Sequence, residues 1–326
     1  MQTQILIGIG ILIIVIGLIW FFIIRRKTNE EKLLHASEKG DIRRVKELLK
    51  IDGIDINKAD KDGFTPLYIA CQEGYIDIVN ALLKKDGIKI NKAADDGATP
   101  LHHACRKGHI DIVTALLEKE SIKVNNATDE GATPLMIACQ EGHEVIVKEL
   151  LKKEGIEINK AADNGQTPLF IACLEGHEAI VNVLLEKDGI EINKANDDGV
   201  TPLCIACVKG HKDIVNALLE NNNIDVDKAK NNGATPLFIT CSQGHEVIVN
   251  ALLDKEGIKI NNSRSDGATS LFLACLQGHE AIVSALLENA EIKINKANKD
   301  GYTPLSIATL MDHNVIAAIL KEKGAK

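Results

Sequence analysis

The chain has 326 residues and a formal net charge of −8, and it is 45 % hydrophobic but only 3 % aromatic. Its core must therefore be built from Ala, Ile, Leu and Val, which suits thin stacked helices better than one deep globular interior. Residues 25–50 hold nine basic and five acidic side chains, so the acidic excess lies after them. An acidic body repels phosphates, which argues against a nucleic-acid partner.

Residues 5–24 are a run of twenty uncharged residues. A helix of that length rises about 30 Å, the thickness of a bilayer's hydrocarbon core. Trp20 and two Phe stand at its basic end, where aromatic rings favour the membrane interface. A cleaved signal peptide is disfavoured because no basic region precedes the run, the run is too long and no Ala-x-Ala site follows. The sequence thus predicts a single-pass transmembrane anchor over residues 1–27.

The charges beside this run predict its orientation. Positive residues collect on the cytoplasmic side of a membrane, and here all of them follow the run. We therefore expect the N-terminus outside and the rest of the chain in the cytoplasm. Basic residues soon after the run are expected to face anionic lipid. The predicted membrane-facing residues are Arg25, Arg26, Lys27, Arg43, Arg44 and Lys46.

From residue 63 onward the sequence repeats every 34 residues. Glycine recurs at this spacing from Gly63 to Gly301, followed each time by Thr two positions later and Leu four positions later. Pro stands between Thr and Leu in every unit except one, where Ser270 replaces it. A fixed period of this length predicts a solenoid of stacked units.

Each unit predicts two helices joined by turns. The Asp-Gly or Asn-Gly pair before most of these threonines favours a tight turn with positive φ, Thr caps a helix, and Pro fits its first position. In one unit the first helix is expected to end at Gly176. Ile180, Val181 and Leu184 then give the second helix a buried face.

The ordered motifs Gly-x-Thr-Pro-Leu, Ala, Gly-His, Ile-Val, Leu-Leu and Ile-Asn resemble the ankyrin repeat over residues 28–326. The resemblance implies an all-α solenoid, with a helix-turn-helix and a β-turn or hairpin loop per repeat, here preceded by a single transmembrane helix. We expect an N-terminal cap repeat at 28–61, seven full repeats at 62–299 and a C-terminal cap repeat at 300–326. The last cap has the polar Thr309 and Lys321 where full repeats have Cys and Leu, as solubility requires.

Two periodic residue types could be mistaken for a chemical site. The periodic cysteines are expected to lie about one helix diameter apart, beyond disulfide reach, and so to be free buried thiols. The histidines after the inter-helix glycines are too far apart to share a metal ion, and we expect bonds to local backbone or neighbouring side chains. His103 occupies an apolar position and is expected to be a hydrogen-bonded core histidine.

No phosphate-binding loop and no activated nucleophile stands outside the repeat pattern. The sequence therefore predicts no enzyme, no cofactor, no metal and no small-molecule substrate.

The resemblance implies that another protein binds along the concave side, through turn tips and first helices. Because many tips are acidic, we expect a basic or extended partner, with three helix positions adding exposed apolar contacts. The alternative explanation of the acidic tips is that Asp and Asn are good turn formers on a solvated face. The candidate partner-binding residues are Asp95, Asp96, Asp129, Glu130, Asp163, Asp197, Asp198, Leu174, Glu175, Val208 and Leu276.

The sequence favours a membrane-anchored scaffold or adaptor that mediates protein–protein interaction on the cytoplasmic side. The alternative keeps the solenoid but places it outside the cytosol, as a surface-exposed or secreted interaction protein. Asn126 and Asn261 lie in sequons, and a glycan on either would favour this alternative.

Overall fold

The computed structural model describes residues 28–326. The predicted transmembrane segment 5–24 and Arg25, Arg26 and Lys27 lie outside the described residues. In the part of the chain that is described, no helix is both long enough and apolar enough to cross a membrane. The chain divides into two compact units, one ending at Lys123 and the other running from Val124 to Lys326.

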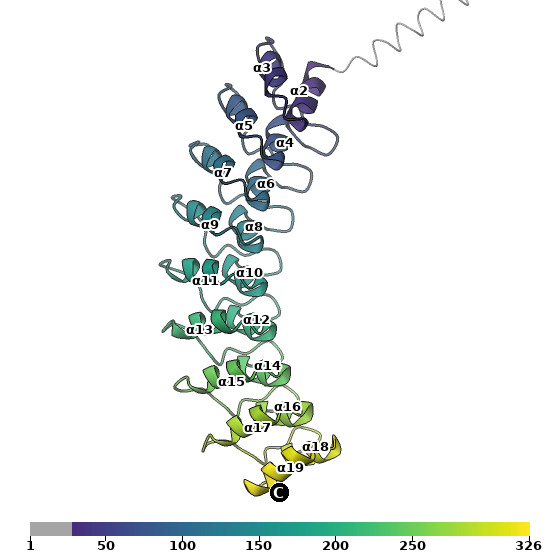
Figure 1. Cartoon of the computed structure of the whole chain (residues 1–326), viewed down its shortest axis with the longest axis vertical. Helices are drawn as coiled ribbons and strands as arrows, with labels where there is room; N and C mark the ends of the chain where they lie inside the picture. Colours follow the sequence, from purple (N-terminus) through teal and green to yellow (C-terminus); the bar gives the residue numbers. More distant parts are fainter. Residues whose placement is uncertain (1–27) are drawn as a thin grey trace, which may run out of the picture. The chain divides into compact units, whose positions relative to one another are not determined.

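The described residues form eighteen helices in nine consecutive pairs (Figure 1). Unit 1 contains α2 (Asn29–Glu38), α3 (Ile42–Leu48), α4 (Pro66–Glu73), α5 (Ile76–Leu83), α6 (Pro100–Lys107) and α7 (Ile110–Leu117). Unit 2 contains α8 (Pro134–Gln140), α9 (Glu144–Leu150), α10 (Pro168–Glu175), α11 (Glu178–Leu185), α12 (Pro202–Lys209), α13 (Lys212–Glu220), α14 (Pro236–Gln243), α15 (Glu246–Leu253), α16 (Ser270–Gln277), α17 (Glu280–Leu287), α18 (Pro304–Leu310) and α19 (Asn314–Glu322). The predicted all-α repeat of helix pairs is confirmed.

The first helix of a pair begins and ends where local chemistry predicts. In α10 the Thr167 hydroxyl accepts a hydrogen bond from Phe170 N at 3.2 Å, which satisfies a free N–H of the first turn. Pro168 follows, where no backbone bond is lost. The helix ends at Gly176, whose φ of +83° strains any residue with a Cβ. Both ends of the first helix are therefore determined by residues close to them in the sequence.

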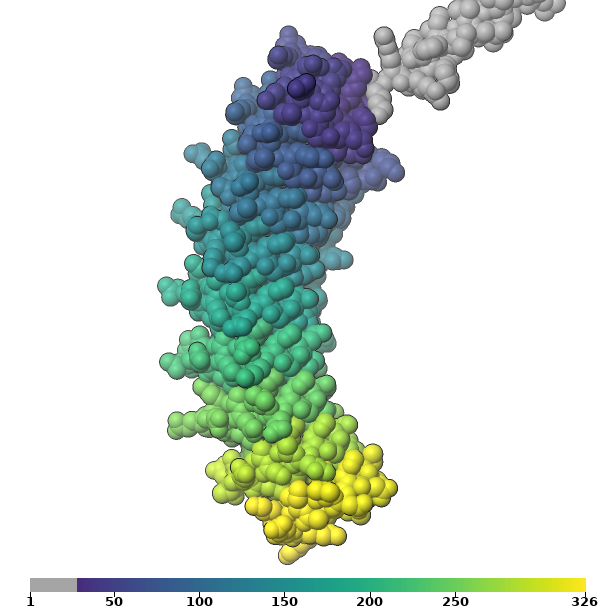
Figure 2. All heavy atoms as spheres, in the orientation of Figure 1, coloured from purple at the N-terminus to yellow at the C-terminus, as the bar shows by residue number. Residues whose placement is uncertain are grey.

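Within each unit, first helices pack on first helices and second helices on second helices. In unit 2, α10 contacts α8 and α12, while α11 contacts α9 and α13, and Figure 1 shows the two columns. Ala172 and Cys173 in α10 are fully buried, and such small side chains let neighbouring helices approach closely. Figure 2 shows side chains closing the spaces between successive pairs of a unit. The core is thus thin and repeated.

Several of the recurring histidines join a repeat to the one before it. His177 Nε2 donates to the carbonyl oxygen of Gln140 at 3.1 Å, 37 residues earlier. The ring also fills the space beside Gly142, where a Cβ would lie 2.7 Å from His177 Cε1. His109, His211 and His313 make the same bond in their units. The expected local partner is therefore wrong, because the acceptor belongs to the preceding repeat.

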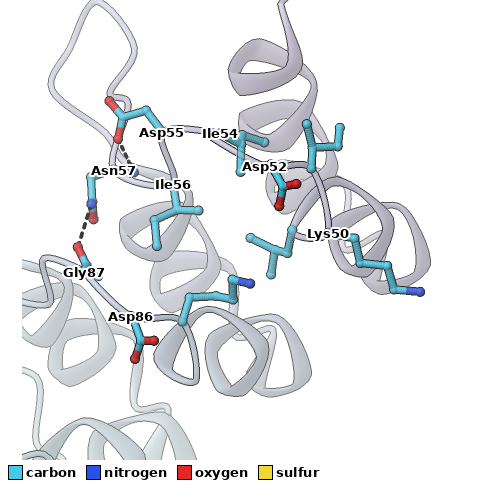
Figure 3. A pocket seen from close by; sticks show the side chains of 12 residues that line it. Lys50, Asp52, Ile54, Asp55, Ile56, Asn57, Asp86 and Gly87 are labelled. Carbon is cyan, nitrogen blue, oxygen red and sulfur yellow. Dashed lines mark hydrogen bonds between the residues drawn. The ribbon is translucent and has the colours of Figure 1, made fainter.

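An asparagine ladder ties the loops that follow the second helices. Asn57 Nδ2 donates to the Gly87 carbonyl at 2.9 Å (Figure 3), and its Oδ1 accepts from Lys89 N at 2.8 Å. The same pair of bonds is made by Asn91, Asn125, Asn159, Asn193 and Asn261. At the equivalent position between Asn193 and Asn261, Asp227 accepts from Lys259 N but has no amide hydrogen to donate.

The last helix pair differs from those before it. Thr309 and Lys321 are exposed, whereas their counterparts Cys275 and Leu287 are buried. This agrees with a polar outer face on a terminal repeat. The division into caps at 28–61 and 300–326 around full repeats at 62–299 stays a prediction.

Candidate partner-binding site

The turn tips, which are the residues around the periodic glycines, have a fixed backbone. At one tip in unit 2, Ala162 N donates to Gln166 O at 2.9 Å and Gly165 N donates to Ala162 O at 2.9 Å. Successive tips are also joined, because Asp163 N donates to Glu130 O at 3.1 Å. These backbone groups thus bond to one another, and the acidic side chains lie at the surface of the tips. In unit 1 the Asp96 carboxylate also accepts a hydrogen bond from Ala98 N at 2.9 Å.

The acidic candidate residues are all exposed, as the sequence predicts. Unit 1 carries Asp95 and Asp96, and unit 2 carries Asp129, Glu130, Asp163, Glu175, Asp197 and Asp198. Glu175 ends α10, and the others belong to turn tips.

The apolar candidates are less exposed than the sequence predicts. Leu174, Val208 and Leu276 are only partly accessible. Leu310, which holds the same position in the last helix pair, is 62 % exposed. Because the structure has no further pair beyond Leu310, the comparison indicates that the following repeat shields this position in the others. Their description as exposed contacts is therefore corrected to partly covered side chains.

Three acidic candidates meet around one recess in unit 2. Asp129, Glu130 and Asp163 line a cavity of about 500 Å³, above the buried side chains of Met136 and Ile171. We call it the acidic recess, and its lining is completed by Ala132, Gln140, Ala162, Asn164 and Gln166. Since no basic side chain lines it, an alkylammonium or guanidinium group from another molecule would find unpaired carboxylates there. Asp197, Asp198, Leu174 and Glu175 do not line this recess.

Sequence reasoning missed the floor of the acidic recess. Met136 and Ile171 fit the apolar pattern of the first helices, and neither was among the candidate residues. Both are buried, at 3 % and 8 % exposure, yet both line the recess. A core residue that also lines a cavity has the same apolar pattern as one that does not. The two are distinguished only by how one repeat packs against the tip of the next.

Unit 1 carries an aromatic cluster at its first helices. Tyr68 stacks on Phe64, with ring centroids 4.5 Å apart, and its hydroxyl lies 2.5 Å from His103 Nε2, within a hydrogen bond. Burial lowers the pKa of His103 to about 4 and raises the pKa of Tyr68 to about 12. Both groups are thus neutral at pH 7. The predicted hydrogen-bonded core histidine is confirmed, although His103 is half-buried and its Nδ1 has no partner among the described residues.

The thiols are placed for packing rather than chemistry. None of the eight cysteines forms a disulfide, and all of them are buried. Burial raises the pKa of the Cys207 thiol to about 12, and the pKa of Cys139 moves in the same direction, so these thiols stay protonated. Over residues 28–326, no group of three or more His, Cys, Asp or Glu side chains is arranged to hold a metal ion.

The predicted membrane-facing residues within the described chain lie on one helix. Arg43, Arg44 and Lys46 are exposed on α3, and Arg44 pairs with Glu47 at 2.7 Å. Lys46 also lines a cavity of about 510 Å³ with Lys50, Lys84 and Lys85, which we call the lysine recess. One carboxylate, that of Asp77, lines it as well.

The stacked helix pairs, the glycine-ended first helices and the tied turn tips together define a helical-repeat solenoid. The family model for ankyrin repeats in three copies matches residues 33–128, 86–162, 120–196, 189–264 and 257–326. These overlapping matches run over most of the chain, which therefore belongs to the ankyrin-repeat family. Ankyrin repeats are protein-binding modules and generally not enzymes, so the chain is a protein–protein interaction scaffold. No curated protein matches it.

Proposed function

We propose that this chain is a membrane-anchored scaffold that binds an extended, basic segment of another protein on the side formed by turn tips and first helices. The observation that carries the proposal is the acidic recess, in which three carboxylates surround an apolar floor. Among the described residues, no Lys or Arg lines this recess. The remaining acidic tips at Asp95, Asp96, Asp197 and Asp198 would extend the attraction along their units.

A Lys or Arg side chain fits the acidic recess in both of its parts. Its aliphatic stem would cover Met136 and Ile171, while its charged head would lie among the carboxylates. Charge-assisted hydrogen bonds of this kind are stronger than neutral ones, and Arg can make two in parallel. The tips already have fixed backbones, so little loop ordering would oppose binding.

A selection from random peptides tests this proposal. The full-length chain in detergent micelles is panned against a displayed library of random 16-residue peptides, and the enriched sequences are read. We expect enrichment of Lys and Arg. A variant with Asp129→Asn, Glu130→Gln and Asp163→Asn should bind the best selected peptide at least tenfold more weakly, because one hydrogen bond to a charged group is worth roughly 1.5–3 kcal/mol.

The control variant removes the same charge elsewhere in unit 2. Glu154→Gln, Glu186→Gln and Glu256→Gln change three exposed carboxylates in the loops that follow second helices. This variant should keep nearly full affinity. Equal losses in the two variants, or selected peptides without basic residues, would contradict a site at the acidic recess.

The membrane part of the proposal is supported by the start of the described chain. Thr28 caps α2, which begins at Asn29, so four residues separate Ile24 from the first helix. Four residues span at most about 14 Å, which would hold the first helix pair close to a bilayer. The lysine recess and α3 then offer positive charge for anionic lipid headgroups. We accordingly assign 1–27 to an anchor and 28–326 to the repeat domain.

Fractionation of cells tests the anchor. The full chain should stay with membranes after extraction at high pH, and a chain lacking residues 1–27 should be released. Protease added outside sealed cells should leave the repeats intact if they lie in the cytoplasm. A full chain that is extracted at high pH like the shortened one would remove the anchor from the proposal.

Two observations support the cytoplasmic side over the surface-exposed or secreted alternative. None of the eight cysteines forms a disulfide, which suits a reducing compartment. The amide of Asn261 donates to Glu291 O at 2.8 Å, so a glycan there would replace one hydrogen of a group that joins two repeats. Detection of a glycan at Asn126 or Asn261 would favour the alternative.

A further inference from the structure

The acidic recess has a counterpart three repeats further along unit 2. Phe238 stands where Met136 does, and Ser242 where Gln140 does, each three periods of 34 residues later. The counterpart encloses about 300 Å³, and we call it the arginine recess. It is lined by Val208, Lys230, Asn232, Ala234, Phe238, Ile239, Ser242, Gln243 and Arg264. The two recesses are therefore equivalent places in the repeat, with different side chains.

The charges around the two recesses are opposite. The positions of the three carboxylates in the acidic recess hold the uncharged side chains of Asn231, Asn232 and Ser265 in the later repeats. In addition, Lys230 and Arg264 replace Thr128 and Ala162. A site that suits a cation in one repeat thus becomes, three repeats later, a site that suits an anion.

Arg264 is held in place by two contacts. Its guanidinium carbon lies 5.1 Å from the centre of the Phe238 ring, and its Nε donates to Asp266 Oδ2 at 3.1 Å. Nη2 donates to the same carboxylate oxygen, and Nη1 makes no hydrogen bond within residues 28–326. Because Lys230 adds a second positive charge, Asp266 neutralises only part of the recess. The guanidinium is positioned, and part of its donor capacity is unused.

The floor of the arginine recess is apolar. Phe238 and Ile239 are 4 % and 8 % exposed, and Val208 is partly covered. An apolar floor below two cations fits the methylenes and carboxylate of a Glu, or of an Asp beside an apolar residue. A nucleic-acid backbone is disfavoured, since the exposed Asp197 and Asp198 belong to the preceding tip.

We propose that the arginine recess binds an acidic side chain of the same partner segment whose basic side chain occupies the acidic recess. This inference rests on the proposed function and adds the register that near-identical repeats would otherwise leave open. The two recesses select one charge order along the partner and reject the reverse order, since like charges would then face each other at both places.

The repeat spacing fixes the distance between the two charges. Successive helix pairs pack about 8–10 Å apart, so three repeats span roughly 25–30 Å. Extended chain rises about 3.3 Å per residue. The partner should therefore carry its basic and acidic residues about eight or nine positions apart.

The peptide selection described above tests the register when its sequences are analysed for paired charges. Enriched peptides should carry an acidic residue about eight or nine positions from the basic one. The order of the two residues, from N-terminus to C-terminus, should be the same in all of these peptides. Selection on a Lys230→Gln, Arg264→Gln variant should keep the basic residue and lose the acidic one. A control variant, Lys212→Gln with Lys321→Gln, removes two exposed cations on second helices and should select the same peptides as the wild type.

A charge-swapped variant makes the test independent of any loss of folding. Lys230→Glu with Arg264→Glu should enrich a second basic residue at the position where the wild type selects an acidic one. The best wild-type peptide should bind this variant at least tenfold more weakly.

Basic residues enriched without a paired acidic residue would overturn the register and leave the proposed function standing. A peptide without basic residues would overturn both. Phosphoserine preferred over Glu by more than tenfold in synthetic versions of the best peptide would replace the carboxylate with a phosphate and overturn the stated occupant.

Discussion

At position 103 a histidine stands where the other repeats have isoleucine or leucine, and its hydrogen bond partner is Tyr68 of the preceding repeat. The equivalent pairs in unit 2, such as Phe170 with Ile205, are apolar on both sides. Removing one partner of a buried hydrogen bond leaves an unsatisfied polar group, whereas replacing both is nearly neutral. The pair should therefore behave as a unit.

We predict that Tyr68→Phe and His103→Ile each destabilise the protein by about 1–3 kcal/mol, and that the double variant loses much less than the two added together. Urea unfolding of the four proteins checks this cycle. Additive losses would show that the hydrogen bond contributes nothing beyond the two side chains' packing.

The same pair predicts a dependence on pH. Burial is the main cause of the lowered pKa of His103, about 4 in the folded protein, and the cation of Arg106 acts in the same direction while the carboxylate of Asp96 opposes it. A folded-state pKa below the ordinary value means that the unfolded chain binds the proton more strongly. The wild type should thus lose stability as pH falls from about 6.5 toward 4, and the double variant should lose less over that window. Parallel stability curves would contradict this.

Position 103 also shows what a sequence can reveal about single residues. The break in the periodic pattern identified His103 as unusual and as a hydrogen-bonded histidine. The identity of its partner, 35 residues earlier, depends on the stacking of α4 on α6, which the local sequence does not encode. The histidine after each inter-helix glycine is a similar case, since its acceptor is 37 residues away.

At the scale of the element, Asp227 interrupts the asparagine ladder. Its carboxylate accepts from Lys259 N, but it cannot donate to the following loop as Asn193 does to Asn223 O. Burial raises the pKa of Asp227, as expected of a carboxylate that loses water without gaining a full set of donors. One ladder step is therefore weaker than the others.

We predict that Asp227→Asn stabilises the protein by about 1 kcal/mol at pH 7, the worth of one hydrogen bond, and that Asn193→Asp destabilises it by a similar amount. Because the folded-state pKa of Asp227 is raised, protonation favours the folded wild type, and the advantage of Asn should shrink as pH falls through that pKa. Urea midpoints of the variants at pH 7 and pH 4 measure both effects. A destabilising Asp227→Asn would show that the carboxylate is the better group at this step.

The helices themselves were predictable because their ends are local. Thr167 and Pro168 start a helix and Gly176 ends it through contacts within a few residues. The exposure of Leu174 was not predictable in the same way, since the next repeat covers it. Boundaries thus come from adjacent residues, and accessibility comes from stacking.

At the scale of the whole molecule, a strict 34-residue period predicts a solenoid, and the nine helix pairs over residues 28–326 confirm this prediction. The acidic tips were predictable too, because they belong to the repeated turn. Lys230 and Arg264 were missed because the candidates were taken from positions directly beside the tip glycines, and these two residues stand three positions before them. Aligning the repeats places Lys230 and Arg264 at the positions of Thr128 and Ala162. That three carboxylates share one cavity required the structure.

The acidic excess of the chain should act mainly on the association rate of a basic peptide, and the acidic recess should also act on its dissociation rate. Both triple variants of the acidic test raise the formal net charge of −8 by the same three units. Distant charges steer the encounter, whereas charges in contact with the ligand hold it. We predict that the variant of Glu154, Glu186 and Glu256 slows association of the best basic peptide by less than about twofold and leaves its dissociation rate unchanged.

The variant of Asp129, Glu130 and Asp163 should instead speed dissociation about tenfold, in addition to a similar slowing of association. Raising the salt concentration from 50 to 500 mM should reduce the association rates of the wild type and both variants toward one value, because the Debye length then falls to a few ångströms. Biolayer interferometry at the two salt concentrations separates the rates. If the two variants changed the dissociation rate equally, the peptide would be held by the field of the whole acidic body. A binding site at the acidic recess would then be contradicted.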